Sequence, residues 1–121
     1  MTSPKVMTFG PFTFELTNGV LSKHGNTVRL QSQPARVLAL LIEHAGEVVT
    51  RDQLRQAIWG EVWVNFDEGL NYCIRQIRIA LNDDARRPSY LQTFPHRGYR
   101  FVGTVSPAIA LPAGTGTALR T

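Results

Sequence analysis

An amphipathic segment between residues 66 and 81 constrains the fold more than any other part of the chain. Its apolar side chains recur at intervals of four, three and four residues, the spacing of one helical face: Leu70, Ile74, Ile77 and Leu81. At about 100° of rotation per residue, this stripe brings Asn71, Arg75 and Arg78 together about a quarter-turn away. The pattern predicts a helix that packs one face into a core and presents arginines beside it.

Two shorter stretches with helical spacing precede this segment. The first begins near Ser32, a predicted N-cap, and is expected to stop at Gly46. The second begins at Thr50, where Gln53 completes a capping box. With residues 46–49 as their connection, the two helices have the outline of a helix-turn-helix.

β-structure is predicted on both sides of the helices. Before residue 31, apolar residues near a two-residue period and turn signals at 18–19 and 24–26 indicate three or four short antiparallel strands. Segments 90–94 and 99–102 flank the basic turn 95–98 and predict a β-hairpin. The predicted fold class is α+β: a winged helix-turn-helix with a small N-terminal antiparallel β-sheet, a three-helix core and a C-terminal β-hairpin wing.

The length of 121 residues has room for one domain. We expect an N-terminal extension at 1–8, a domain at 9–103, and a flexible linker or tail at 104–121, where Pro, Ala, Gly and Thr predominate. The apolar runs are too short for a membrane span, and no signal peptide is evident. We therefore expect a soluble, cytoplasmic protein, and leave open a membrane anchor in a longer parent chain. The lone cysteine, Cys73, is expected to be a small buried apolar residue.

The net charge of +4 is concentrated in one segment. Residues 1–70 carry six basic and seven acidic side chains, whereas residues 71–103 carry six arginines against two aspartates. The planar guanidinium group suits phosphates and guanine edges. An ordinary basic surface would have the same charge, so charge alone leaves both interpretations open.

Enzymatic and metal-binding functions find no support in the sequence. The histidines His24, His44 and His96 lack ligand spacing. No glycine-rich phosphate loop, nucleophile elbow or recognisable carboxylate pair is present. We expect no catalytic activity, no cofactor, no metal and no small-molecule substrate.

Four motifs resemble those of one family: GEVVTRDQL, the WG at Trp59, LNYCIRQIRIAL and FPHRGYRFVG. With the order of the predicted elements, these motifs resemble the OmpR/PhoB-type winged-helix output domain of bacterial transcription regulators. The resemblance covers roughly residues 9–103. The hairpin with proline before its basic tip resembles the CadC/ToxR-like branch. The resemblance implies sequence-specific binding of double-stranded DNA, with a recognition helix at about 66–81 in the major groove and a wing at about 94–99 at the minor groove.

The resemblance also implies which residues contact DNA. The predicted contacts are Trp59, Asn71, Tyr72, Arg75, Gln76, Arg78, Thr93, His96, Arg97 and Tyr99. Trp59 matches a residue that donates to phosphate, and Thr93 and Tyr99 match wing residues that contact the DNA backbone. Asn71 could instead be a structural amide and Tyr72 could cover the helix edge. Glu68, Cys73 and Gln76 depart from the common family pattern, so Gln76 is expected to read adenine.

Further partners follow from the same resemblance. Family members commonly bind tandem half-sites, so promoter DNA with self-association on it is expected. The loop 61–66 matches one that often contacts RNA polymerase. The alternative from a different class is a winged-helix protein–protein interaction module whose basic face docks an acidic partner.

Overall fold

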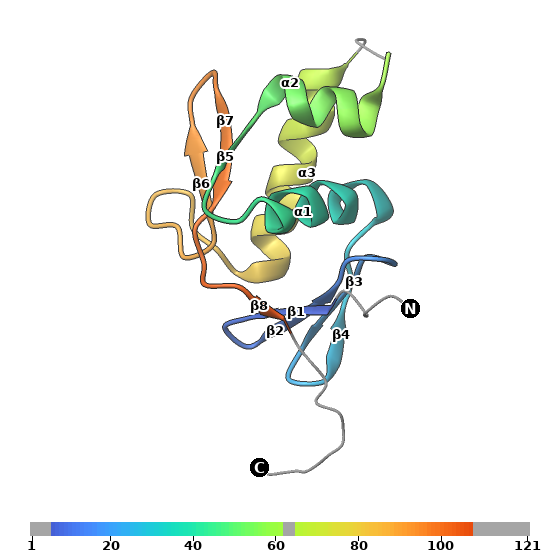
Figure 1. Ribbon diagram of the computed structural model, residues 1–121, viewed down its shortest axis with the longest axis vertical. Helices are drawn as coiled ribbons and strands as arrows, with labels where there is room; N and C mark the ends of the chain where they lie inside the picture. The colour runs from blue at the N-terminus through green and yellow to red at the C-terminus, as the bar shows by residue number, and fades with distance from the viewer. Residues whose placement is uncertain (1–5, 62–64, 108–121) are drawn as a thin grey trace.

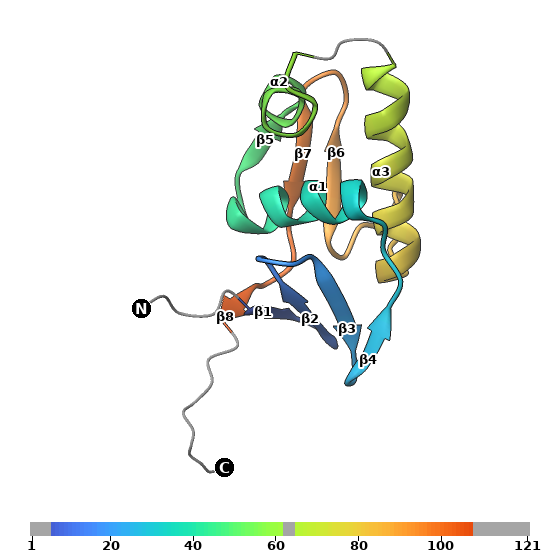
Figure 2. The ribbon, with the colours of Figure 1, turned by 90° about the vertical axis from the view of Figure 1, so that its right-hand side faces the viewer.

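The computed structural model describes residues 6–61 and 65–107. It contains three α-helices, one of which continues into a single π-helical turn: α1 (Ser32–Glu43), α2 (Arg51–Leu54) with η1 (Arg55–Trp59), and α3 (Phe66–Leu81). All strand pairs are antiparallel, and they form two sheets. The helix α1 crosses between these sheets, and α3 runs beside the hairpin of β6 and β7 (Figures 1 and 2). This architecture confirms the predicted α+β winged helix-turn-helix class.

The N-terminal sheet has the strand order β4-β3-β2-β1-β8. Its strands are β1 (Val6–Phe9), β2 (Phe12–Glu15), β3 (Val20–Lys23), β4 (Asn26–Val28) and β8 (Ser106–Pro107). It begins before residue 9 and takes in residues after 103, so it reaches beyond the range 9–103 on both sides. The short β8 is held to β1, where the hydroxyl of Thr8 donates to the carbonyl of Ser106 at 3.2 Å. A two-residue strand has too little periodicity to be predicted from sequence.

The second sheet has the strand order β5-β7-β6. Its strands are β5 (Val48–Thr50), β6 (Leu91–Phe94) and β7 (Gly98–Phe101). The second half of the predicted connection 46–49 is therefore part of a strand, in which Val49 lies opposite Tyr99 and is buried. The wing hairpin is confirmed, but one of its strands is the middle strand of a sheet and is paired on both edges.

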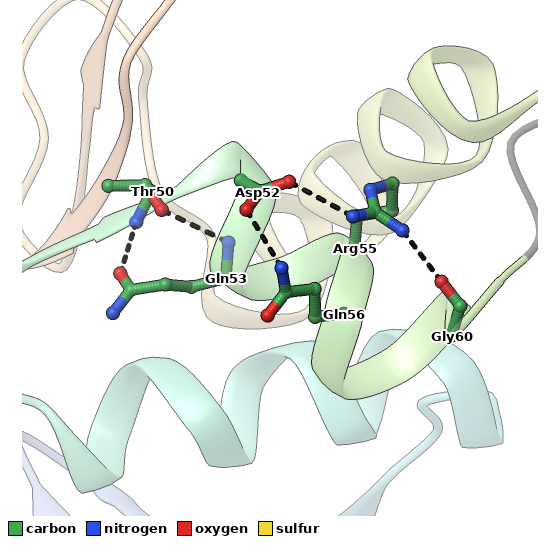
Figure 3. A network of polar contacts seen from close by, with 6 residues as sticks. All are labelled: Thr50, Asp52, Gln53, Arg55, Gln56 and Gly60. Carbon is green, nitrogen blue, oxygen red and sulfur yellow. Dashed lines mark hydrogen bonds and ion pairs between the residues drawn. The ribbon is translucent and has the colours of Figure 1, made fainter.

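The helix starts are confirmed at two of three positions. Thr50 caps α2 with a complete capping box: its hydroxyl accepts from the Gln53 amide at 3.0 Å, and its own amide donates to the Gln53 side chain at 2.8 Å (Figure 3). α3 starts at Phe66, within the predicted range. The prediction of Ser32 as an N-cap was wrong, because Gln31 takes that place without a side-chain bond. Pro34 is the third helical residue and has no N–H for a cap to accept from.

The end of α1 also differs from the prediction. The helix stops at Glu43, before the expected Gly46, with His44 as its C-cap. The Gly46 amide instead donates to the carbonyl of Phe101 at 2.9 Å, which ties the connection to the wing sheet. Because Gly46 is bonded to β7, the helical path ends before this residue.

The core joins both sheets to all three helices. The predicted stripe of α3 is buried, with Leu70 and Ile77 fully inaccessible. The ring of Phe9 lies 5.1 Å from Phe101 and 5.5 Å from Tyr90, both edge-on, so aromatic packing links β1 to the wing sheet. One continuous apolar cluster fixes the rotation of α3 and packs the wing sheet against the same core.

We predict that Gly98→Ala destabilises the fold through crowding. A Cβ at Gly98 would stand 2.0 Å from the Val49 carbonyl oxygen and 2.8 Å from the Thr50 Cα, where β7 meets β5. Overpacking of this kind typically costs about 1–3 kcal/mol. Gly25→Ala, at φ +83° with nothing within 4 Å of the added Cβ, measures the cost of backbone strain without crowding. Urea denaturation should show a clear loss of stability in Gly98→Ala, and wild-type stability in that variant would contradict this explanation.

Candidate nucleic-acid interface

The helix α3 presents a polar and partly cationic face because its opposite face is buried. Asn71, Tyr72 and Arg75 are exposed, whereas Gln76 and Arg78 are half-buried. Ile79 is 66% exposed, an unusual position for a large apolar side chain. The predicted rotation of the helix therefore holds, although two of its five predicted contact residues are less accessible than the pattern indicated.

A groove runs between α3 and the wing strands. It brings together five of the predicted contact residues: Asn71, Arg75, Arg78, Thr93 and Tyr99. Tyr99 is only 5% exposed and belongs mainly to the core, so its ring forms the groove's inner wall. The groove combines cationic, amide and hydroxyl groups, which are donors that phosphate oxygens accept from.

Among the residues that the structure describes, Asp83 is the one acidic residue that lines this groove, and its carboxylate already accepts hydrogen bonds. One oxygen accepts from the Ser89 amide at 2.7 Å and the other from the Leu91 amide at 2.9 Å, with the Tyr90 amide at 3.3 Å from both. These bonds fix the start of β6 against the end of α3. They fill acceptor sites of the carboxylate within the protein, and its one negative charge stands against the two positive charges of Arg75 and Arg78 in the groove.

Arg78 spans the groove from helix to wing. Its Nη2 atom donates to the Thr93 hydroxyl at 2.8 Å and to the Leu91 carbonyl at 3.0 Å, both on β6. A helical periodicity cannot indicate such a partner, because β6 is thirteen to fifteen residues further along the chain. The structure thus gives this predicted contact residue partners within the protein.

The turn of the wing presents His96 and Arg97 at its surface. Both are exposed, and His96 adopts φ 64°. The turn is anchored to the start of α2, since the Arg97 carbonyl accepts from the Arg51 amide at 2.9 Å. Further down the hairpin, Arg100 donates to Gln92 at 2.9 Å and lies over the Phe94 ring. Arg97 is consequently the arginine that the wing projects.

Trp59 and Tyr72 have packing roles as well as exposed surface. Trp59 is half-buried and stands edge-on to Phe66 at 5.1 Å, while its ring also lies against Gly69, where a Cβ would come within 3.1 Å. The Tyr72 hydroxyl donates to the Gln31 side chain at 2.7 Å, which ties α3 to the start of α1.

The segment that leads from α2 to α3 contains a second polar network. The buried Arg55 donates to the Gly60 carbonyl at 2.7 Å and to Asp52 at 3.1 Å, and Gln56 donates to the same carboxylate at 3.0 Å (Figure 3). This arginine closes the π-helical turn and supports the fold. Of the predicted loop 61–66, residues 62–64 lie outside the described residues.

Three exposed residues were not among the predicted contacts. Ile79 follows Tyr72 by seven positions on the same outward face, so the helical period could have indicated it. Arg86 and Arg87 are exposed in the loop between α3 and β6. The charge count of residues 71–103 included both arginines, but a loop has no periodicity from which to infer their direction.

Cys73 is fully buried, as expected, and burial raises the pKa of its thiol to about 11. Within residues 6–61 and 65–107, no three side chains of metal-ligand type gather closely enough to hold an ion. Among the helices of that same part of the chain, none has both the length and the apolar character for crossing a bilayer.

Comparison with known proteins identifies the family. The family model described as "Transcriptional regulatory protein, C terminal" matches residues 25–101. A cholera toxin homolog transcriptional activator of Vibrio parahaemolyticus is 36% identical over 98 residues, which cover 78% of this chain and 34% of that protein. The chain thus spans about a third of the length of this relative.

Solved structures of the same type superimpose over most of the chain. The RstA DNA-binding domain of Klebsiella pneumoniae, in complex with the RstA box, has a TM-score of 0.70 and 28% identity and covers 81% of this chain and 97% of its own. The DNA-binding domain of E. coli CadC has a TM-score of 0.70 and 25% identity, with 88% and 99% covered. The chain therefore belongs to the family of transcriptional regulatory protein C-terminal domains, the OmpR/PhoB-type winged helix-turn-helix domains.

Proposed function

We propose that this chain binds double-stranded DNA in a sequence-specific manner, as the DNA-binding domain of a bacterial transcription regulator. The observation that carries the proposal is the groove between α3 and the wing, in which Asn71, Arg75 and Thr93 converge and the Asp83 carboxylate already accepts from backbone amides. The major groove of B-DNA admits an α-helix. The similar structures of RstA and CadC are DNA-binding domains, and that of RstA is in complex with the RstA box, which supports the same partner here.

Eight of the ten predicted contact residues have a role in this proposal. Arg75 contacts a phosphate, and Gln76 reads a base edge, with adenine as the preferred partner. Arg97 enters the minor groove from the wing turn, with His96 beside it. Trp59 and Asn71 contact the DNA backbone near the start of the recognition helix. Tyr72 adds an aromatic edge, and Tyr99, which lines the groove from the core side, contacts the DNA backbone.

The proposal extends to the assembly on DNA. We propose that copies of the chain associate with one another on tandem DNA half-sites and that the 61–66 loop contacts RNA polymerase. We propose no catalytic activity and no cofactor. The domain proposed for DNA binding is 9–103 together with the flanking sheet strands β1 and β8. Bacterial DNA lies in the cytoplasm, so we propose that location for this domain. Docking of an acidic protein is the alternative, and the family that the chain belongs to does not favour it.

We predict a strong dependence of DNA affinity on salt. Four arginines of residues 71–103 are exposed, namely Arg75, Arg86, Arg87 and Arg97. If each neutralises a phosphate, log K should fall against log salt concentration with a slope of about −4, since each phosphate contributes about 0.9. Fluorescence anisotropy with a random-sequence duplex measures this slope.

The matched variants are Arg75→Ala and Arg36→Ala, which remove the same charge from different faces. Arg36 is exposed on α1 and lines a separate groove beside β4. Arg75→Ala should flatten the slope by about 0.9, and Arg36→Ala should leave it unchanged. Failure of the wild-type chain to bind any duplex at low salt would contradict the proposed function and favour the protein-docking alternative.

We predict that Gln76→Ala changes base preference more than overall affinity. An amide that bonds an adenine edge contributes about 1–3 kcal/mol of discrimination at one base pair. Selection of bound duplexes from a randomised library, with wild-type and variant chains in parallel, should show one position that loses its preference. A uniform loss of affinity for all sequences would argue against base readout by Gln76.

We predict that Arg97→Ala removes a preference for A·T-rich sequence beside the half-site. Narrow A·T minor grooves have enhanced negative potential that attracts an inserted arginine. The test compares two selected duplexes that differ only in an A·T or G·C segment under the wing. If the variant keeps the wild-type preference between the two duplexes, Arg97 does not make this contact.

A further inference from the structure

Arg78 and Thr93 form a hydrogen-bonded pair that joins the recognition helix to the wing. The two hydrogens of Nη2 are directed to two acceptors on β6, the Thr93 hydroxyl at 2.8 Å and the Leu91 carbonyl at 3.0 Å. Arg78 is half-buried and its Nε is buried, so the guanidinium lies within the groove and not on its rim. Thr93 is exposed at the groove edge. A bound anion would therefore meet the hydroxyl before the guanidinium.

The chemistry of this pair determines the direction of the Thr93 hydroxyl. A guanidinium has donors only, whereas a hydroxyl has one hydrogen and two lone pairs. The Thr93 oxygen must therefore accept from Arg78, and its own hydrogen must point elsewhere. A hydroxyl that accepts from a cation is also polarised towards stronger donation. The arrangement makes Thr93 an outward donor, which suits an anionic oxygen.

We infer that Arg78 is a positioning residue for one phosphate of the DNA backbone, which Thr93 contacts directly. Arg78 sets the distance between α3 and β6 and orients the Thr93 hydroxyl as the donor to that phosphate. This inference rests on the proposed function and differs from the expectation that Arg78 itself contacts DNA. It couples a residue of the recognition helix to a contact made by the wing.

The experiment removes phosphate charges one at a time. A duplex obtained by selection with the wild-type chain is prepared as a series, each with one methylphosphonate linkage, and the change in Kd is measured for every position. Thr93→Val deletes the hydroxyl and should abolish sensitivity at one phosphate. Arg78→Met should abolish sensitivity at that same phosphate. Thr93→Ser, which restores a hydroxyl, should restore the sensitivity that Thr93→Val loses.

A double-variant cycle adds a second readout. Each single variant should raise Kd for the unmodified duplex by about tenfold, the effect of a lost hydrogen bond to a charged group. Because both act through one contact, the double variant should add no more than about twofold. Loss of sensitivity at a different phosphate in Arg78→Met, or additive effects, would overturn the inference and indicate direct contact by Arg78.

The fold of each variant is compared by circular dichroism and thermal unfolding. If Arg78→Met does not fold, Arg78→Lys keeps the charge but loses the forked geometry, and the same shared phosphate should lose most of its sensitivity. An unchanged phosphate profile in that variant would overturn the inference. Absence of DNA binding by the wild-type chain would overturn this inference and the proposed function together, whereas normal wild-type binding with an unchanged Arg78 profile would overturn this inference alone.

Discussion

The pairing of β7 on both of its edges is the interaction on which the rest of the structure depends. β7 takes β6 on one side and β5 on the other, and the absence of a side chain at Gly98 allows the closest approach to β5. Since β5 leads directly into the capping box of α2, the same contact also sets where the second helix begins. An isolated two-stranded hairpin is marginally stable at best in water. The third strand therefore turns a flexible element into a platform from which Arg97 can project with a defined direction.

Polar contacts then set the distance between this platform and α3. The apolar stripe of α3 fixes the rotation of the helix, but apolar packing is not directional and leaves the wing edge undetermined. Asp83 and Arg78 provide direction from the C-terminal end of α3: the carboxylate accepts from amides at the start of β6, and the guanidinium donates to the hydroxyl and carbonyl two residues apart on that strand. Two opposite charges near the end of α3 thus both form hydrogen bonds to β6.

Local patterns were sufficient for the helices and most strands but not for β5, for β8 or for the contacts between elements. The stripe from Leu70 to Leu81 and the capping box at Thr50 were predictable because each is encoded within a few residues. β5 was missed because three residues between two helices resemble a turn until a partner strand is present. The burial of Tyr99 and the internal bonds of Arg78 were missed for the same reason, since their partners lie on other elements. The sequence pattern predicted residue types that can contact DNA. The tertiary structure separates those that face outward from those that bond to other elements of the fold.

That separation changes how the positive charge of the domain is interpreted. Six arginines in residues 71–103 indicated a broad cationic surface, yet two of them, Arg78 and Arg100, are engaged with side chains or carbonyls of the wing. A guanidinium that already has protein acceptors has fewer donors to offer a phosphate, and its orientation is fixed before any ligand arrives. The charge of Arg78 nevertheless remains within the groove, where it raises the local potential. Half-buried arginines in such a domain can therefore favour an anionic partner through the field and through the groups they orient, without forming the contact themselves.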